Sequence, residues 1–109
     1  MQDYEKRAKT RLVVTDEVLV RDRVNNLLLG KLANIHEEGF MVIGSGAMLE
    51  DHVYEVQLDA SNASVRASAE CLWTSETGSG ENLWAGFTFL EVQPDDQEKL
   101  RLLVKLFQP

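Results

Sequence analysis

The chain has 109 residues, of which 44% are hydrophobic and 27% are charged, and this is enough for one domain with one core. Its formal net charge of −7 argues against binding to nucleic acid polymers, because such proteins neutralise phosphates with a basic surface. No apolar run approaches the roughly 20 residues of a membrane-spanning helix, and the polar first residues do not resemble a secretory signal. We therefore expect a cytoplasmic protein that does not insert into membranes.

The chain begins with a basic segment, although the protein as a whole is acidic. Residues 1–11 carry four basic side chains against two acidic ones, and residues 12–98 carry four basic and sixteen acidic side chains. Such a segment is either a solvated tail along an acidic body or a local site for a small anion. We expect residues 1–11 to form a flexible arm and residues 12–109 to form the folded domain.

Short apolar stretches in the first 92 residues predict β-strands. Tyr54, Val56 and Leu58 alternate with polar neighbours, as in a half-buried strand. After a polar turn at 60–63, five residues at every second position are expected to share one face of the next strand: Val65, Ala67, Ala69, Cys71 and Trp73. Further strands are expected at 12–14, 18–20, 27–35, 40–43 and 83–92. Five or six short strands at close spacing predict a small antiparallel barrel.

The end of the chain changes to a helical period. Pro94 suits a first helical position, and acidic residues follow it near the positive end of the helix dipole. Leu100, Leu103, Val104 and Phe107 have the i, i+3, i+4, i+7 spacing of a buried face. The pattern predicts a helix over about 94–107 that packs on an open end of the barrel. Leucines at 102 and 106 widen its apolar face, which permits a homodimer or a partner protein besides ordinary core packing.

The sequence offers little for catalysis or metal binding. It lacks a nucleophile elbow, a His-Glu-x-x-His motif and a Gly-rich phosphate loop. His36 and His52 lie beside carboxylates and are more typical of surface histidines than of metal ligands. Cys71, the only cysteine, lies on an apolar strand face and is expected to be an inert core thiol. We expect no enzyme, no metal and no cofactor.

Two motifs stand out because of their order and setting. Arg7 and Arg11 lie four apart just before the first strand, and Asn34, His36 and Gly39 lie at a turn between two apolar strands. Together they resemble the PilZ domain family, whose hallmark is Arg-x-x-x-Arg followed by Asp/Asn-x-Ser-x-x-Gly. The strand that ends at Trp73 and the stretch Gly86-Phe87-Thr88-Phe89 also resemble that family. The resemblance covers nearly the whole chain.

The resemblance implies a mainly β fold, a six-stranded antiparallel PilZ-type barrel with a C-terminal helix, that binds the second messenger cyclic di-GMP. In this family the two arginines, here Arg7 and Arg11, hold phosphate and guanine, and the position of Lys6 influences how the ligand is held. A guanidinium suits this role because its planar fork of donors matches both a phosphate and the O6/N7 edge of guanine. Asn34 would offer an amide, and Gly39 would let a ligand approach the backbone.

The second motif departs from the family pattern at His36, which replaces serine. Its ring would either contact guanine or fill the space of the base, and Glu37 and Glu38 add negative charge beside it. One interpretation is therefore a cyclic di-GMP receptor that passes the signal to an unidentified effector protein, in motility, biofilm or polysaccharide control. The alternative is a degenerate PilZ-like module that binds protein and no nucleotide. The sequence leaves open whether the chain is a monomer or a homodimer.

Overall fold

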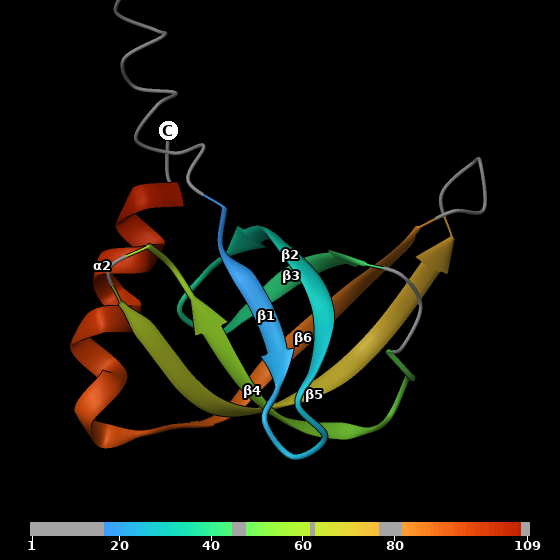
Figure 1. The fold of residues 1–109 in the computed structure, drawn as a ribbon, viewed down its shortest axis with the longest axis horizontal. Helices are drawn as coiled ribbons and strands as arrows, with labels where there is room; N and C mark the ends of the chain where they lie inside the picture. The colour runs from blue at the N-terminus through green and yellow to red at the C-terminus, as the bar shows by residue number, and fades with distance from the viewer. Residues whose placement is uncertain (1–16, 45–47, 62, 77–81, 108–109) are drawn as a thin grey trace, which may run out of the picture.

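The computed structural model describes residues 17–44, 48–61, 63–76 and 82–107, and these form a closed barrel with one helix beside it (Figure 1). Lys6, Arg7, Arg11 and the expected strand at 12–14 lie outside the described residues. In chain order, the elements are β1 (Leu19–Asp22), β2 (Leu27–Ile35), β3 (Gly39–Gly44), β4 (Val53–Asp59), β5 (Ser64–Glu76), β6 (Leu83–Val92), a 3-10 turn η1 (Pro94–Asp96) and α2 (Gln97–Phe107).

The six strands pair in the order β1-β2-β3-β6-β5-β4, with β4 returning to β1, and every pair is antiparallel. Closure leaves no sheet edge along the paired segments, which protects a small β-domain from edge-to-edge association. The prediction of a mainly β, six-stranded antiparallel barrel with a C-terminal helix is confirmed. Within the described residues, each expected strand is present, and the largest difference is at β5, which continues three residues beyond Trp73 to Glu76.

Small and branched apolar side chains fill the barrel, and their burial alternates most clearly in the first part of β5. In β5, Val65, Ala67, Ala69 and Cys71 are all buried, and the residues between them are partly exposed. The prediction that Trp73 shares this face is wrong. The register of β5 against β6 shifts between Cys71 and Trp73, so a β-bulge at this point moves the indole to the surface, where it is 39% exposed.

The helix closes one end of the barrel, as its apolar period predicts. β2 and β5 lie on opposite sides of the closed strand order, and α2 packs against both, so it must cross an open end. Leu100, Leu103 and Val104 are buried there. Among the described residues, no helix has the length and apolar character needed to cross a membrane.

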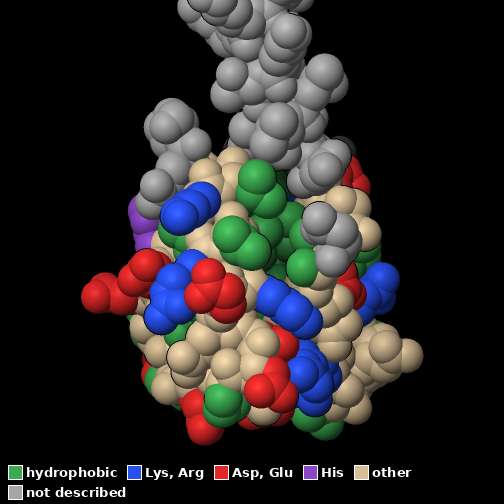
Figure 2. Space-filling view, turned by 90° about the vertical axis from the view of Figure 1, so that its left-hand side faces the viewer, with side chains coloured by type: hydrophobic (Ala, Val, Ile, Leu, Met, Phe, Trp, Pro, Cys, Tyr) green, Lys and Arg blue, Asp and Glu red, His purple; other side chains and the backbone are tan. Residues whose placement is uncertain are grey.

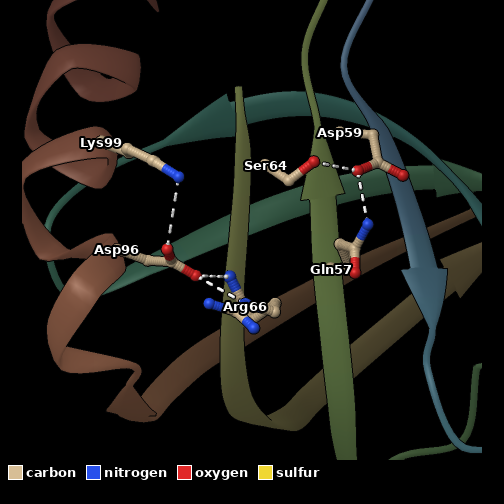
Figure 3. Close-up of polar contacts among 6 residues, drawn as sticks. All are labelled: Gln57, Asp59, Ser64, Arg66, Asp96 and Lys99. Atoms are coloured by element: carbon tan, nitrogen blue, oxygen red, sulfur yellow. Dashed lines mark hydrogen bonds and ion pairs between the residues drawn. The ribbon is translucent and has the colours of Figure 1, made fainter. Parts of the chain in front are cut away.

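A buried carboxylate fixes the start of the helix to the barrel (Figure 3). Asp96 is 1% exposed, and its Oδ2 accepts hydrogen bonds of 2.9 Å from both the backbone N–H and the Nε of Arg66 on β5. The Arg66 side-chain hydrogen bond lowers the pKa of Asp96 from its usual value, against the opposing effect of burial. Lys99 Nζ lies 3.6 Å from the other carboxylate oxygen. The helix therefore begins at a fixed point on the barrel wall.

A second polar cluster closes the β4–β5 turn (Figure 3). Asp59 Oδ1 accepts hydrogen bonds of 2.8 Å from Gln57 and 2.7 Å from Ser64. Burial alone would raise the pKa of Asp59, but the hydrogen bonds from Ser64, Gln57 and Arg21 lower it. This carboxylate is ionised at neutral pH and holds the ends of β4 and β5 together.

Candidate functional site

The second sequence motif forms the hairpin between β2 and β3. The backbone N–H of His36 donates to the carbonyl of Gly39 at 2.8 Å, which closes a turn whose residues 36–38 are exposed. The carbonyl of Glu38 accepts from the backbone N–H of Phe89 at 2.9 Å and from the hydroxyl of Thr88 at 3.2 Å. The turn is thus tied to β6 and has a defined position on the barrel.

Gly39 is needed for close strand packing. A Cβ placed there would lie 2.3 Å from the backbone carbonyl oxygen of Phe87, which is far inside van der Waals contact. The sequence suggested that this glycine lets a ligand approach the backbone. In the fold it lets β6 approach β3, so its glycine requirement holds without any ligand.

Asn34 presents its amide next to the turn. The register of β2 against β3 shifts between Leu32 and Asn34, and Asn34 Oδ1 accepts a hydrogen bond of 2.8 Å from the backbone N–H of Ile35. This bond fixes the direction of the side chain. No protein acceptor for its NH₂ group is found within the described part of the chain, so the amide has donors to offer.

A cleft of about 220 Å³ brings the motif together with residues from two further strands. Its polar lining comes from Asn34 and His36, and the rest is largely apolar: Gly39, Phe40, Met41, Leu72, Trp73, Gly86 and Phe87. The floor is rigid because Phe40 and Phe87 stack with ring centroids 4.9 Å apart and planes 2° apart. The cleft can therefore receive a flat ring between an aromatic wall and a polar hairpin.

Trp73 forms part of this wall because Gly86 leaves room for it. A Cβ at Gly86 would lie 2.2 Å from the indole Nε1, so the ring rests directly on the backbone of β6. The sequence did not single out Trp73 as a site residue. The signals were its place at the end of an apolar strand and the resemblance of that strand to the PilZ family, and the bulge that exposes it has no signature in the sequence.

The chain enters the barrel at the end that carries this cleft. The backbone N–H of Leu32 donates to the carbonyl of Val18 at 2.8 Å, and β1 and β2 are antiparallel. Val18, which directly precedes β1, therefore lies beside the C-terminal half of β2, the strand that carries Asn34. Arg11 precedes Glu17 by six residues, which allows a reach of about 20 Å at roughly 3.3–3.6 Å per residue.

The described residues around the cleft supply little positive charge. Glu37 and Glu38 are exposed in the turn, and neither lysine nor arginine lines the described cleft. Within the same ranges, no group of three or more metal-ligating side chains is found. Burial raises the pKa of the Cys71 thiol, as does the charge of Glu50, which agrees with an unreactive core cysteine.

Comparison with known proteins places this geometry in a family. The family model for the PilZ domain matches residues 5–106. The chain belongs to the PilZ domain family. The match includes the positions of Lys6, Arg7 and Arg11 as well as the β2–β3 hairpin, so the residues of both predicted motifs fall inside it.

Solved PilZ structures share the fold at low sequence identity. A structure of the PilZ domain of YcgR from Escherichia coli with c-di-GMP has a TM-score of 0.64 and 15% identity, over 85% of this chain and 82% of that chain. The Bacillus subtilis inhibitor of motility MotI/DgrA has a TM-score of 0.61 and 11% identity, over 83% of this chain and 46% of that chain. No curated protein matches the sequence.

Proposed function

We propose that this PilZ domain is a cytoplasmic receptor for cyclic di-GMP that acts on an effector protein, and we assign no catalytic step to it. The observation that carries the proposal is the cleft that joins Asn34 and His36 to the exposed indole of Trp73. The neighbouring fold of the YcgR PilZ domain was solved with c-di-GMP, which supports the choice of ligand. Motility, biofilm or polysaccharide control are the processes that the family resemblance suggests.

Each described residue has a role that its chemistry supports. The Asn34 NH₂ would donate to the base or its phosphate, and the His36 ring would add a polar edge or a stacking face. Trp73 would stack on guanine, an interaction worth about 1–3 kcal/mol per base. Gly39 acts indirectly, by holding β3 against β6.

The cleft is too small to enclose a whole cyclic dinucleotide. Its volume of about 220 Å³ is below the roughly 300–1,000 Å³ of typical small-molecule sites. The remainder of a cyclic dinucleotide would need cover from elsewhere, and the phosphates need cations. Lys6, Arg7 and Arg11 precede Glu17 by six to eleven residues and would supply both, with the two arginines as bidentate donors to phosphate and guanine.

A second candidate is a PilZ module that binds protein without nucleotide. It is favoured by Glu37 and Glu38, which are exposed in the β2–β3 turn beside the cleft. Their negative charges oppose the binding of an anionic ligand. This candidate predicts that Arg11→Ala leaves effector binding intact and that cyclic di-GMP does not change it.

Calorimetric titration of the full chain with cyclic di-GMP distinguishes the two. Binding at micromolar concentrations, weakened at least tenfold in Arg7→Ala, Arg11→Ala and Trp73→Ala, is the expected result. Absence of binding at about 100 μM ligand would overturn the receptor proposal. His36→Ser resolves the role of the histidine, because a gain in affinity identifies the ring as a block and a loss identifies it as a contact.

A further inference from the structure

A second hollow lies between α2 and the β4–β5 turn, on the side of the molecule that Figure 2 faces. Its volume is about 490 Å³, within the range of specific binding sites. Val65 and Leu103 form a buried floor, and Ala60 and Ala63 line the side that the turn provides. We refer to this hollow as the α2 groove. None of its lining residues lines the cleft at the β2–β3 turn.

The outer wall of the groove leaves apolar surface in water. Leu102 is 54% exposed and Leu106 is 41% exposed, one helical turn apart on α2. Figure 2 shows hydrophobic side chains gathered on this face, with both basic and acidic side chains around them. Apolar surface at the mouth of a hollow is typical of a site that another apolar group covers.

The charged residues at the groove are lysines. Lys99 and Lys105 line it, and no carboxylate does so among the described residues. Lys99 contacts Asp96 at 3.6 Å but keeps 49% of its side chain exposed, and Lys105 has no ion-pair partner within the described ranges. On a chain with a net charge of −7, this local pair of cations sets the groove apart from the body.

Both walls of the groove are preformed. The start of α2 is held by the Arg66–Asp96 ion pair at 2.9 Å. The opposite wall is a closed turn, in which the backbone N–H of Ala60 donates to the carbonyl of Ala63 at 2.9 Å. A partner would therefore lose little affinity to reorganisation of the groove.

We infer that the α2 groove docks an acidic amphipathic helix of a partner protein. Leucine-type side chains at i and i+4 of that helix would cover Leu102, Leu106 and the buried floor, as in other helix-in-groove complexes. Aspartate or glutamate beside them would pair with Lys99 and Lys105, and this complementarity sets the choice of partner.

The same lysines disfavour the two other occupants. A second copy of the chain, with its α2 antiparallel in the groove, would place the lysines of one helix against those of the other, and like charges in contact oppose pairing. The chain's own residues 1–16 include an apolar stretch but carry four basic and three acidic side chains. Their net positive charge also opposes the lysine rim.

A displayed library of helical peptides, selected against the full nucleotide-free chain, tests the inference directly. We expect selected peptides to share apolar residues at i and i+4 flanked by Asp or Glu. Fluorescence anisotropy with the best peptide should show affinity lowered about tenfold or more by Leu102→Ser, since the burial of a leucine side chain is lost. Lys105→Glu should weaken binding to a similar degree, and increasingly so at low salt.

Two matched variants control for general effects on the surface. Leu28→Ser removes a leucine that is 48% exposed on β2, and Arg23→Glu makes the same change in net charge at the exposed β1–β2 turn. Both should bind the peptide as the wild type does. Selected peptides without acidic residues, or equal affinity for Leu102→Ser and wild type, would overturn the inference.

Two further outcomes would also overturn it. One is a dimer, seen by sedimentation, that Leu102→Ser abolishes. The other is a set of methyl contacts between Leu102 and residues 12–14 in NMR spectra. Because the peptide assay contains no cyclic di-GMP, its outcome is independent of whether the nucleotide proposal holds.

Discussion

Two glycines on neighbouring strands have different reasons to lack a side chain. A Cβ at Gly39 would meet the backbone carbonyl oxygen of Phe87 at 2.3 Å, and a Cβ at Gly86 would meet the indole of Trp73 at 2.2 Å. A paired backbone cannot move without disturbing the sheet, whereas a partly exposed indole can rotate away. An alanine substitution should therefore lower stability at Gly39, whereas at Gly86 it should change the position of Trp73.

Gly39→Ala is expected to destabilise the barrel by about 1–3 kcal/mol, the usual cost of overpacking a well-packed site. In a domain of this size each kcal/mol lowers Tm by roughly 4–8 °C, so thermal unfolding followed by circular dichroism would detect it. Gly86→Ala should cost less and should instead displace Trp73. Tryptophan emission of Gly86→Ala in a Trp84→Phe background, compared with Trp84→Phe alone, measures that displacement.

One result would contradict this prediction for Gly39→Ala and Gly86→Ala. Equal losses of stability in the two variants, with Trp73 emission unchanged in Gly86→Ala, would mean that the indole does not rest on Gly86. Gly86→Ala should also weaken cyclic di-GMP binding if Trp73 stacks on the base. Gly39→Ala, at temperatures where it remains folded, should weaken it less.

At the scale of the residue, the sequence located the side of the cleft that the β2–β3 hairpin forms. Asn34 and His36 were found because a polar motif stands at a turn between two apolar runs, and turns are signalled locally. Trp73 was missed because its exposure depends on a bulge opposite Gly86, which is a property of the β5–β6 pair. Whether Lys6, Arg7 and Arg11 meet the cleft stays a prediction.

At the scale of the element, alternation and helical period were sufficient to predict the strands and the helix. β2 and β6 have the bounds that their apolar runs suggest, and the helical region begins at Pro94. The short 3-10 turn η1 before α2 was not expected. Asp96 in this turn bonds to Arg66 on β5, thirty residues earlier, and such a long-range contact leaves no local signal in the sequence.

This bond makes the attachment of α2 dependent on pH. The Arg66 hydrogen bond lowers the pKa of folded Asp96 below its usual 3.8, so its contribution is fully present above the unfolded pKa and is lost as pH falls through the folded pKa. Asp96→Asn should cost about 1.5–3 kcal/mol at neutral pH, the range for a hydrogen bond to a charged group. The difference from wild type should shrink below about pH 4. Urea unfolding at several pH values measures both.

Asp95→Asn is the matched control for this prediction. Asp95 is exposed beside Asp96 in the same helical turn, so its substitution makes the same change in net charge and in the helix dipole without removing the Arg66 bond. A loss in Asp95→Asn equal to that in Asp96→Asn would contradict a specific anchor. So would a loss in Asp96→Asn that does not change with pH.

At the scale of the whole molecule, charge is divided between regions. The described residues include the acidic turn at Glu37 and Glu38 and the lysine-lined α2 groove, and the basic segment of residues 1–11 precedes them in the chain. A small anion and an acidic helix would thus be attracted to different places on one acidic protein. Net charge argues against a general polyanion binder, but composition and net charge do not reveal this division.

The division predicts how cyclic di-GMP binding responds to salt. Cyclic di-GMP has two negative charges, which Glu37 and Glu38 repel. The cations proposed to attract it, Lys6, Arg7 and Arg11, belong to the basic segment of residues 1–11. Attraction between partly exposed charges is screened within about 8 Å at physiological ionic strength. Raising salt from about 0.05 M to about 0.5 M should therefore weaken binding several-fold.

Arg11→Ala should bind cyclic di-GMP more weakly, and its affinity should depend less on salt, because one screened contact is already gone. Glu37→Gln should bind more tightly, most of all at low salt. Titration of the three proteins across this range tests the arrangement, and parallel salt dependences in wild type and Arg11→Ala would show that the arginine does not contact the ligand.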